Sequence, residues 1–249
     1  MNSQDLEKPG ITLVSVGPGD PSLITFAAVE AIQRASTVAY PVPEIGAQSI
    51  AAQIAAGWID SKQRKLPLVF PMVKDSSVLR KAWQVVIDKL IKLVGEGENV
   101  VFLSQGDCSI FSTSSYLLKG IKMSDLDFPV RQIPGVTSFA AAASIGGLPL
   151  CLQSEQLLVL PTPDNPETLS LLLDEAACLG RIIVLLKLGE RWGWVKTLLH
   201  EKNILEEALF AEKVGFPDQV ILQASKVSGE LKPYFSLLII RQSWPQIMP

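Results

Sequence analysis

Cysteine and histidine are scarce in this chain of 249 residues, and their scarcity excludes several classes of protein. The three cysteines, Cys108, Cys151 and Cys178, are odd in number and form no CxxC pair, so neither a disulfide framework nor a zinc ribbon fits. The single histidine, His200, falls late in an amphipathic helix pattern, where a surface or capping position is expected. We therefore predict reduced thiols and no metal site, and we assign no catalytic nucleophile or base.

The chain also lacks a long apolar run and an excess of charge of one sign. Its most apolar stretches, such as 139–152, are interrupted by Ser, Gly or Pro well short of the about 20 residues that cross a bilayer. Segment 1–10 is polar and mixed in charge, unlike a secretion signal. With 22 basic and 25 acidic residues, no basic face for nucleic acid is expected. These absences predict a cytoplasmic protein with neither a membrane nor a nucleic-acid partner.

Strand-like and helix-like patterns alternate along the whole chain, which is typical of an α/β protein. The first domain, 1–137, is predicted to hold a mostly parallel five-stranded sheet, with strands at 11–17, 37–41, 65–72, 98–107 and 129–135. Asp20 and Pro21 are predicted to cap and open its first helix. The second domain, 138–249, is predicted to hold a mixed sheet with strands near 157–162, 181–188, 207–214 and 234–241, and a helix at 217–226.

Glycine turns follow three of the predicted strands of the first domain: GPGD at 17–20, Gly106-Asp107, and PGVTS at 134–138. Ligands of open α/β sheets bind beyond the carboxyl ends of the strands, so these turns are candidate binding loops. Asp107 offers an acceptor, although helix capping explains an Asp there as well. A dinucleotide fingerprint is incomplete, because Ser22 stands where the third glycine is needed, and the phosphate-loop motif is absent.

The order GPGDPSLIT, GDCSIFST, IPGVTSFAAAA, EKVGFPDQV and PYFSLLIIR resembles the tetrapyrrole methylases, S-adenosylmethionine-dependent enzymes of corrin and sirohaem synthesis. The resemblance covers nearly the whole chain. PMVKD ahead of the helix with Trp83, the loop 106–113 and PYFSLL are most similar to the branch that methylates carbon 20 of precorrin-2 or cobalt-precorrin-2 in cobalamin biosynthesis. The resemblance implies a homodimer whose two α/β domains form a ligand cleft between them.

The resemblance also implies site residues. The cofactor S-adenosylmethionine would be bound by Pro18, Gln105, Gly106, Asp107, Ile110, Thr137, Ser138, Lys187, Leu188 and Val214. The tetrapyrrole would be bound by Gly17, Gly19, Asp20, Ser112 and Thr113. Two departures concern the cofactor contacts: Cys108 stands where many relatives have proline, and EKVGFPDQ stands where relatives often have Glu-Arg-Ala-Thr or Glu-Arg-Gly-Thr.

Methyl transfer from a sulfonium needs neither a metal nor an enzyme nucleophile, so the expected task of the protein is to position the reactants. A precorrin carries many carboxylates. Their candidate partners are Arg34, Arg80, Arg131, Lys187, Arg191 and Arg241, although a solvated surface charge is the favoured explanation for any single one of them. Alternative functions are methylation of another ring carbon, of uroporphyrinogen, of diphthamide or of ribosomal RNA. A module that binds S-adenosylmethionine without turnover is a further alternative, and a nicotinamide oxidoreductase is disfavoured.

Overall fold

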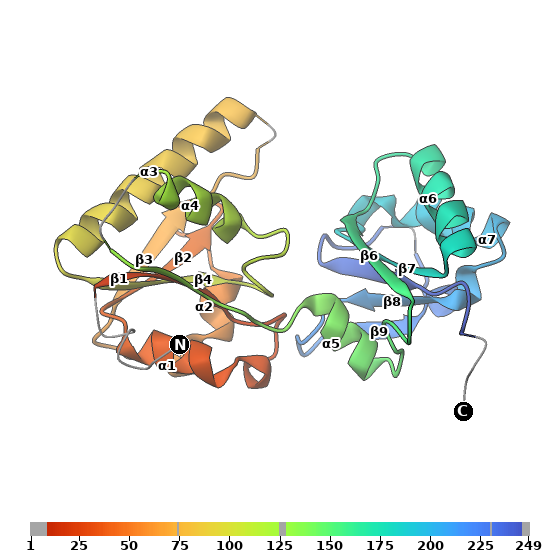
Figure 1. Ribbon diagram of the computed structural model, residues 1–249, viewed down its shortest axis with the longest axis horizontal. Coiled ribbons are helices and arrows are strands. Elements are labelled where there is room, and N and C mark those ends of the chain that lie inside the picture. The colour runs from red at the N-terminus through yellow and green to blue at the C-terminus, as the bar shows by residue number, and fades with distance from the viewer. Residues whose placement is uncertain (1–8, 74, 125–127, 230, 246–249) are drawn as a thin grey trace. The chain divides into compact units, whose positions relative to one another are not determined.

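The computed structural model describes residues 9–73, 75–124, 128–229 and 231–245 (Figure 1). The chain divides into two compact units, Met1–Thr137 and Ser138–Pro249. Each unit combines one five-stranded sheet with its own helices. The predicted fold class, two α/β units with a parallel first sheet and a mixed second sheet, is confirmed.

All strands of the first sheet run parallel, in the order β3-β2-β4-β1-β5. The strands are β1 (Gly10–Ser15), β2 (Thr37–Val42), β3 (Arg64–Val69), β4 (Asn99–Ser104) and β5 (Val130–Ile133). Every residue of β1, an interior strand between β4 and β5, is buried, which explains why its sequence is mainly apolar instead of alternating. Because parallel strands end at one edge, the predicted loops after β1, β4 and β5 lie along the same edge of the sheet.

The helices of the first unit cover both faces of its sheet, with α3 and α4 on one face and α1 and α2 on the other (Figure 1). They are α1 (Phe26–Arg34), α2 (Ile50–Ile54), α3 (Ser76–Gly95) and α4 (Thr113–Lys122). The buried core between α3, α4 and the sheet includes Leu13, Leu90 and Phe102. Burial of such side chains from both layers is what holds the helices on the sheet.

The prediction that the first helix opens at Asp20 and Pro21 is wrong for the α-helix itself. Asp20 caps only a single 3-10 turn, Pro21–Leu23, and the chain is extended again at Ile24. Thr25 then caps α1, its Oγ1 accepting a hydrogen bond from the amide of Ala28 at 3.2 Å. The sequence offers two competing N-caps five residues apart, and the structure uses both.

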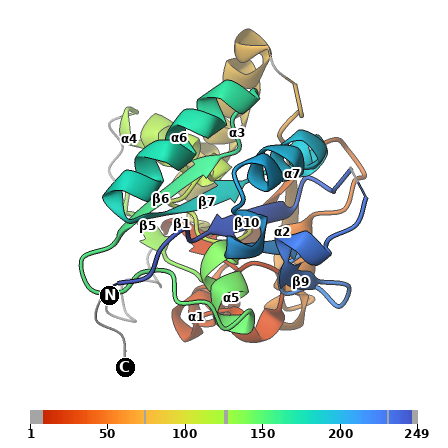
Figure 2. The same cartoon turned by 90° about the vertical axis from the view of Figure 1, so that its right-hand side faces the viewer.

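The second sheet has the order β6-β7-β10-β8-β9, with β6 and β7 parallel and the other pairs antiparallel. Its strands are β6 (Gln156–Pro161), β7 (Arg181–Leu186), β8 (Ala208–Glu212), β9 (Val220–Gln223) and β10 (Ser236–Ile240). Its helices are α5 (Ser138–Ile145), α6 (Pro166–Leu179) and α7 (Trp192–Glu201). Figure 2 shows α6 and α7 together on one side of this sheet and α5 on the other. Trp192, Phe210 and Leu238 are central residues of the core.

The helix predicted at 217–226 is wrong, because this segment forms strand β9 and a single 3-10 turn, Ala224–Lys226. Strand β9 pairs antiparallel with β8, so that Phe210 lies opposite Leu222. The open edge of β8 offers backbone hydrogen bonds that an isolated sequence window cannot reveal, and the β-branched residues Val220 and Ile221 suit a strand. Tertiary pairing therefore overrides the local helical spacing.

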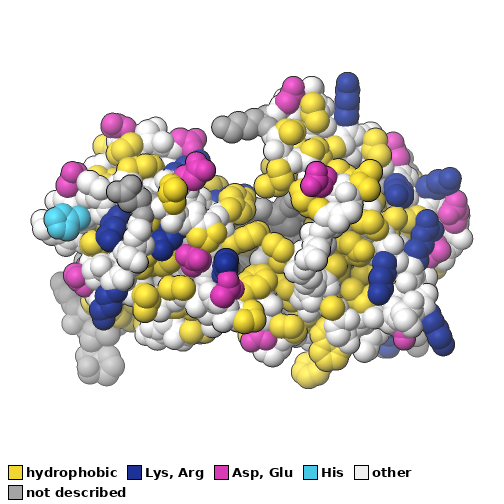
Figure 3. All heavy atoms as spheres, turned by 180° about the vertical axis from the view of Figure 1, so that it is seen from behind, with side chains coloured by type: hydrophobic (Ala, Val, Ile, Leu, Met, Phe, Trp, Pro, Cys, Tyr) yellow, Lys and Arg dark blue, Asp and Glu magenta, His cyan; other side chains and the backbone are white. Residues whose placement is uncertain are grey.

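Two further predictions concern the exposure of His200 and the absence of a membrane-spanning helix. His200, the next-to-last residue of α7, is exposed, as expected for a surface position, and the single cyan side chain in Figure 3 marks it. None of the helices within the described part of the chain combines the length and the apolarity that a bilayer crossing requires.

Candidate functional site

The loops after β1 and β4 are joined directly to each other at the edge where both strands end. The amide of Gly17 donates to the carbonyl of Gly106 at 3.2 Å, and the amide of Gly106 donates to the carbonyl of Gly17 at 2.7 Å. Both glycines have positive φ, +78° and +70°, a region that side chains rarely adopt. The side-chain amide of Gln105 also donates to the carbonyl of Pro18 at 2.9 Å. Two backbone hydrogen bonds and one side-chain hydrogen bond therefore bring four predicted site residues together where the two loops meet.

Asp107 connects the loop after β4 to the loop after β5. Its Oδ1 accepts hydrogen bonds from the amide of Ser109 at 2.8 Å and from the Ser109 hydroxyl, and its Oδ2 accepts from the amide of Gly135 at 2.8 Å. Burial by itself would raise the pKa of this carboxyl, but the hydrogen bonds from Ser109 and Gly135 outweigh burial and hold the pKa below its ordinary value. Asp107 is thus ionised and links two loops, and most of its capacity to accept hydrogen bonds is used within the chain.

Gly135 lies so close to its neighbours that any side chain would collide. A Cβ at this position would stand 2.5 Å from Cβ of Ser15 and 2.7 Å from the carbonyl oxygen of Gly106. Gly135 belongs to the PGVTS turn at 134–138, but nothing in the sequence marks it as a site residue. Its close approach brings the β5 loop into contact with the other two loops.

Replacing Gly135 by Ala should destabilise the protein by about 1–3 kcal/mol, because the added methyl overpacks the loop cluster. Urea denaturation followed by circular dichroism measures this change. Gly95→Ala is the matched control: Gly95 ends α3, has open space around it and should be nearly neutral or slightly stabilising. Equal stability of the two variants would contradict the steric explanation.

The predicted substrate residues have identifiable structural tasks. Ser112 is the N-cap of α4, its hydroxyl accepting from the amide of Ser114 at 3.2 Å, and Thr113 is the first helical residue. Asp20 accepts from the amide of Ser22 at 2.8 Å, and Gly19 is buried beside it. Capping therefore accounts for the carboxyl of Asp20 and the hydroxyl of Ser112, whereas no cap bond accounts for Thr113.

Cys108, which stands where many relatives have proline, uses a backbone group that proline lacks. Its amide donates to the buried hydroxyl of Ser15 at 2.9 Å, and its Sγ lies 3.7 Å from the carbonyl oxygen of Ile133. Ser15, at the end of β1, had no signal in the sequence that marked it as part of this cluster. Cys108 is buried and serves the packing between the β1, β4 and β5 ends. Ile110, two residues further on, is 38% exposed and offers apolar surface beside the loops.

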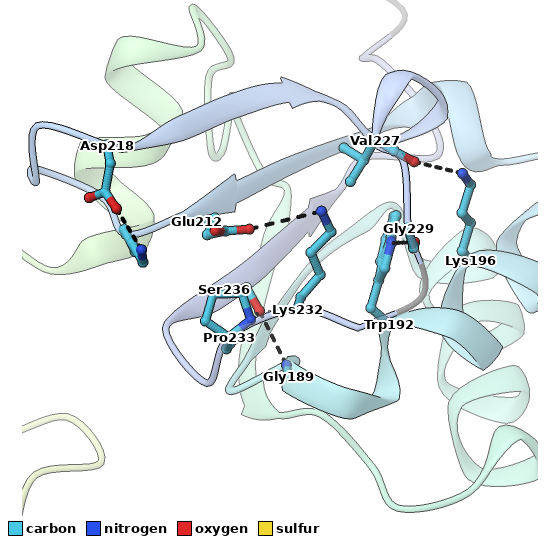
Figure 4. A network of polar contacts seen from close by, with 11 residues as sticks. Gly189, Trp192, Lys196, Glu212, Asp218, Val227, Gly229, Lys232, Pro233 and Ser236 are labelled. Carbon is cyan, nitrogen blue, oxygen red and sulfur yellow. Dashed lines mark hydrogen bonds and ion pairs between the residues drawn. The ribbon is translucent and has the colours of Figure 1, made fainter.

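In the second unit, the predicted cofactor residues Lys187, Leu188 and Val214 lie on two turns at the ends of β7 and β8. Leu188 and Val214 are buried, with 0% and 5% of each residue exposed, and their side chains pack inside the unit. Lys187 and Lys213 have positive φ, +57° and +48°, an uncommon conformation for residues other than glycine. Figure 4 shows the polar contacts around these turns.

Two predicted residues, Thr137 and Ser138, lie where one unit ends and the other begins. Thr137 is the last residue of the first unit, and Ser138 is the first residue of α5. Ser138 therefore does not occupy the N-cap position, which precedes the first helical residue.

The candidate carboxylate partners differ in how far they are committed within the chain. Arg241 is almost fully buried and forms a bidentate ion pair with Glu155, with distances of 2.6 and 2.7 Å. Arg34 pairs with Glu30 and Arg191 pairs with Asp164. Burial removes Arg241 from the set that could meet a substrate, so this candidate is wrong. Lys74, in the quoted PMVKD segment, lies outside the described residues.

A metal centre has no counterpart in the described part of the chain, where no three His, Cys, Asp or Glu side chains are placed to hold an ion. The candidate site instead consists of turns, glycines and amides. Such a site can position a ligand by backbone contacts.

The family model for tetrapyrrole (corrin/porphyrin) methylases matches residues 10–226. The chain belongs to this family. It is 29% identical to the cobalt-precorrin-2 C(20)-methyltransferase of Salmonella typhimurium over 93% of this chain and 95% of that protein. It is 27% identical to the precorrin-2 C(20)-methyltransferase of a Sinorhizobium species, over 91% of this chain and 93% of the relative.

Solved structures support the fold independently of these relatives. The crystal structure of the methyltransferase CobJ matches with a TM-score of 0.70 at 20% identity, over 96% of both chains. The uroporphyrin-III C-methyltransferase of Thermus thermophilus, solved in complex with S-adenosylhomocysteine, matches with a TM-score of 0.63 at 21% identity, over 93% of this chain and 97% of that one.

Proposed function

We propose that this protein transfers a methyl group from S-adenosylmethionine to carbon 20 of precorrin-2 or cobalt-precorrin-2 in cobalamin biosynthesis. The observation that carries the proposal is the near full-length similarity to two relatives that are both named for this ring carbon. Family membership supports a methyl transfer to a tetrapyrrole. The two relatives differ in whether their named substrate carries cobalt, so the proposal includes both substrates.

S-Adenosylmethionine is proposed as the methyl donor, and the site residues fit such a ligand. A Cβ added to Gly106 would meet nothing within 4 Å, so a ligand can approach the backbone there. A Cβ added to Gly189 would have Cα of Tyr234 as its nearest neighbour, at 3.8 Å, although Gly189 itself is buried and only Lys187 of this turn is partly exposed. The solved relative with bound S-adenosylhomocysteine supports the same class of ligand.

When bound, the sulfonium supplies a methyl carbon that is already activated for displacement, and the carbon–sulfur electron pair leaves with sulfur. The residues of this chain hold the reactants in line, which is a proximity and orientation effect. Asp107 is not proposed as the acceptor of the ring proton, because Ser109 and Gly135 already donate to both of its oxygens. Its proposed task is to keep the loops after β4 and β5 in the conformation that receives the ligand.

We also propose a homodimer, which the resemblance to the family supports, and a location in the cytoplasm, as expected from the sequence. Candidate partners for the substrate carboxylates are proposed among Arg80, Arg131 and Lys187, since Arg241 is committed to Glu155. Arg80 is exposed on α3, and Lys187 is partly buried on the turn after β7.

The decisive experiment follows the methyl group. Purified protein is incubated anaerobically with methyl-labelled S-adenosylmethionine and, in separate reactions, with precorrin-2, cobalt-precorrin-2 or uroporphyrinogen III. Label at carbon 20, located by NMR, is the expected result, and the faster substrate identifies the natural one. Label at another carbon, or on uroporphyrinogen III alone, would assign a different methylase reaction. Binding of S-adenosylmethionine without labelling of any ring would favour a sensing module and contradict the proposal.

A further inference from the structure

The segment Pro233–Ser236 contacts both turns that carry the proposed cofactor residues of the second unit. The carbonyl of Phe235 accepts a hydrogen bond from the amide of Lys213 at 2.8 Å. The carbonyl of Ser236 accepts from the amide of Leu188 at 3.0 Å. This segment belongs to the PYFSLL motif, to which neither a cofactor nor a substrate contact was assigned. Its position explains the motif as a common support for two turns that are far apart in sequence.

The hydroxyl of Ser236 adds a bond that the backbone cannot supply. Ser236 is 3% exposed, and its Oγ donates to the carbonyl of Pro233 at 2.7 Å while accepting from the amide of Gly189 at 3.1 Å (Figure 4). A serine hydroxyl has one proton, and donation to Pro233 leaves a lone pair for the amide of Gly189. The orientation of this hydroxyl is therefore determined by both partners.

The turn held by this hydroxyl is one that needs support. Lys187 and Gly189 both have positive φ, +57° and +52°, and the left-handed conformation is unfavourable for a lysine. The amides of Leu188 and Gly189 are both bonded to Ser236, one to its carbonyl and one to its hydroxyl. Losing the hydroxyl would leave the Gly189 amide without this acceptor and would release one of the two bonds that hold the turn.

We propose that Ser236 is a positioning residue for the methyl donor, holding the 187–189 turn in the conformation that binds S-adenosylmethionine. Ser236 acts through the turn and touches neither reactant. This inference rests on the proposed function, because the turn matters to catalysis only if the cofactor binds there.

The test compares Ser236→Ala with Ser236→Thr in the full-length protein, using calorimetric binding of S-adenosylhomocysteine and steady-state kinetics. Removing the hydroxyl should weaken binding about tenfold, whereas Ser236→Thr, which keeps the hydroxyl, should stay within about threefold of wild type. The KM for S-adenosylmethionine should rise in the Ala variant, and the KM for the tetrapyrrole should change less than about twofold. Hydrogen exchange of the Gly189 amide should accelerate only in the Ala variant.

Ile239→Val is the matched control for a general loss of stability. Ile239 is fully buried on the same strand and pairs with Val184 and Leu209, away from both turns. This variant should lower Tm without changing the affinity for S-adenosylhomocysteine. The inference would be overturned if Ser236→Ala bound S-adenosylhomocysteine as tightly as wild type, or if Ser236→Thr lost as much affinity as Ser236→Ala. In either case, binding by the wild type would leave the proposed function intact. Failure of the wild type itself to bind would overturn the proposed function and the inference with it.

Discussion

Asp107→Asn should destabilise the protein by about 2–3 kcal/mol, although the substitution changes only one atom of the side chain. Both carboxylate oxygens of Asp107 accept hydrogen bonds, one from Ser109 and the other from the amide of Gly135. An asparagine has a single acceptor oxygen, so in either orientation its NH2 group faces a backbone N–H that cannot turn away. Urea denaturation at pH 7 measures the loss. The affinity for S-adenosylhomocysteine should fall about tenfold as the loops separate.

Asp75→Asn is the control for this substitution. Asp75 is the exposed N-cap of α3. Only one of its carboxylate oxygens, Oδ1, accepts the capping hydrogen bonds from the amides of Ser77 and Val78, so the one oxygen of asparagine can replace it. Asparagine is also as good an N-cap as aspartate, and the variant should stay within about 0.5 kcal/mol of wild type. A loss at Asp107 no larger than the loss at Asp75 would contradict the two-oxygen explanation.

The effect of Asp107→Asn should depend on pH in a definite direction. The folded-state pKa of Asp107 is lowered from the ordinary value of 3.8, because the hydrogen bonds outweigh burial. A lowered pKa means that the stabilisation is complete above the unfolded-state value and is lost as the pH falls through the folded-state value. The difference in stability between wild type and variant should therefore be constant from pH 7 to about pH 5 and narrow below about pH 4.

Glu155→Ala should destabilise the second unit by about 3–5 kcal/mol, because it leaves the guanidinium of Arg241 buried without its counter-charge. Arg241 is 2% exposed, and both of its terminal nitrogens bind Glu155. Within the described residues its Nε has no hydrogen-bond partner, and its remaining hydrogen bonds go to the neutral carbonyls of Ser243 and Pro149, which carry no counter-charge. Hydrogen exchange of peptides from β6 and β10 locates the loss within the unit.

Two further variants distinguish the cost of leaving a buried charge unpaired from the cost of losing any salt bridge. Glu175→Ala removes the acid of the exposed Glu175–Arg181 pair in the same unit and should cost less than about 1 kcal/mol. The double variant Glu155→Leu with Arg241→Met should recover most of the stability, because no charge is left buried. A double variant as unstable as Glu155→Ala would show that packing, and not the unpaired charge, causes the loss.

The ion pair also predicts acid sensitivity. The hydrogen bonds from Arg241 hold the pKa of Glu155 below its ordinary value of 4.5, against the opposing effect of burial. The stabilisation is therefore full above pH 4.5 and decreases as the pH falls below it. Wild type should lose this part of its stability in acid, whereas the Leu/Met double variant should not.

The sequence by itself determined the alternation of strands and helices, the five parallel strands of the first sheet, the mixed character of the second sheet, and the family. These features follow from local information: runs such as Ile11–Gly17 and 181–188 are mainly apolar because interior strands of a covered sheet are buried on both faces. The glycine turns were also evident, because a glycine directly after a strand is a local signal. The order of the motifs then connected these loops to one family.

Only the tertiary structure decided which residues support the loops. Gly135 has no room for a side chain because Ser15 and Gly106 lie against it, and Asp107 links two loops because Ser109 and Gly135 donate hydrogen bonds to it. Strand β9 replaced an expected helix because the open edge of β8 supplied backbone partners. Ser236 contacts Gly189, which is 47 positions away in the chain, and Glu155 contacts Arg241, which is 86 positions away. Such contacts depend on which strands become neighbours, and the periodicity of a short window carries no information about that.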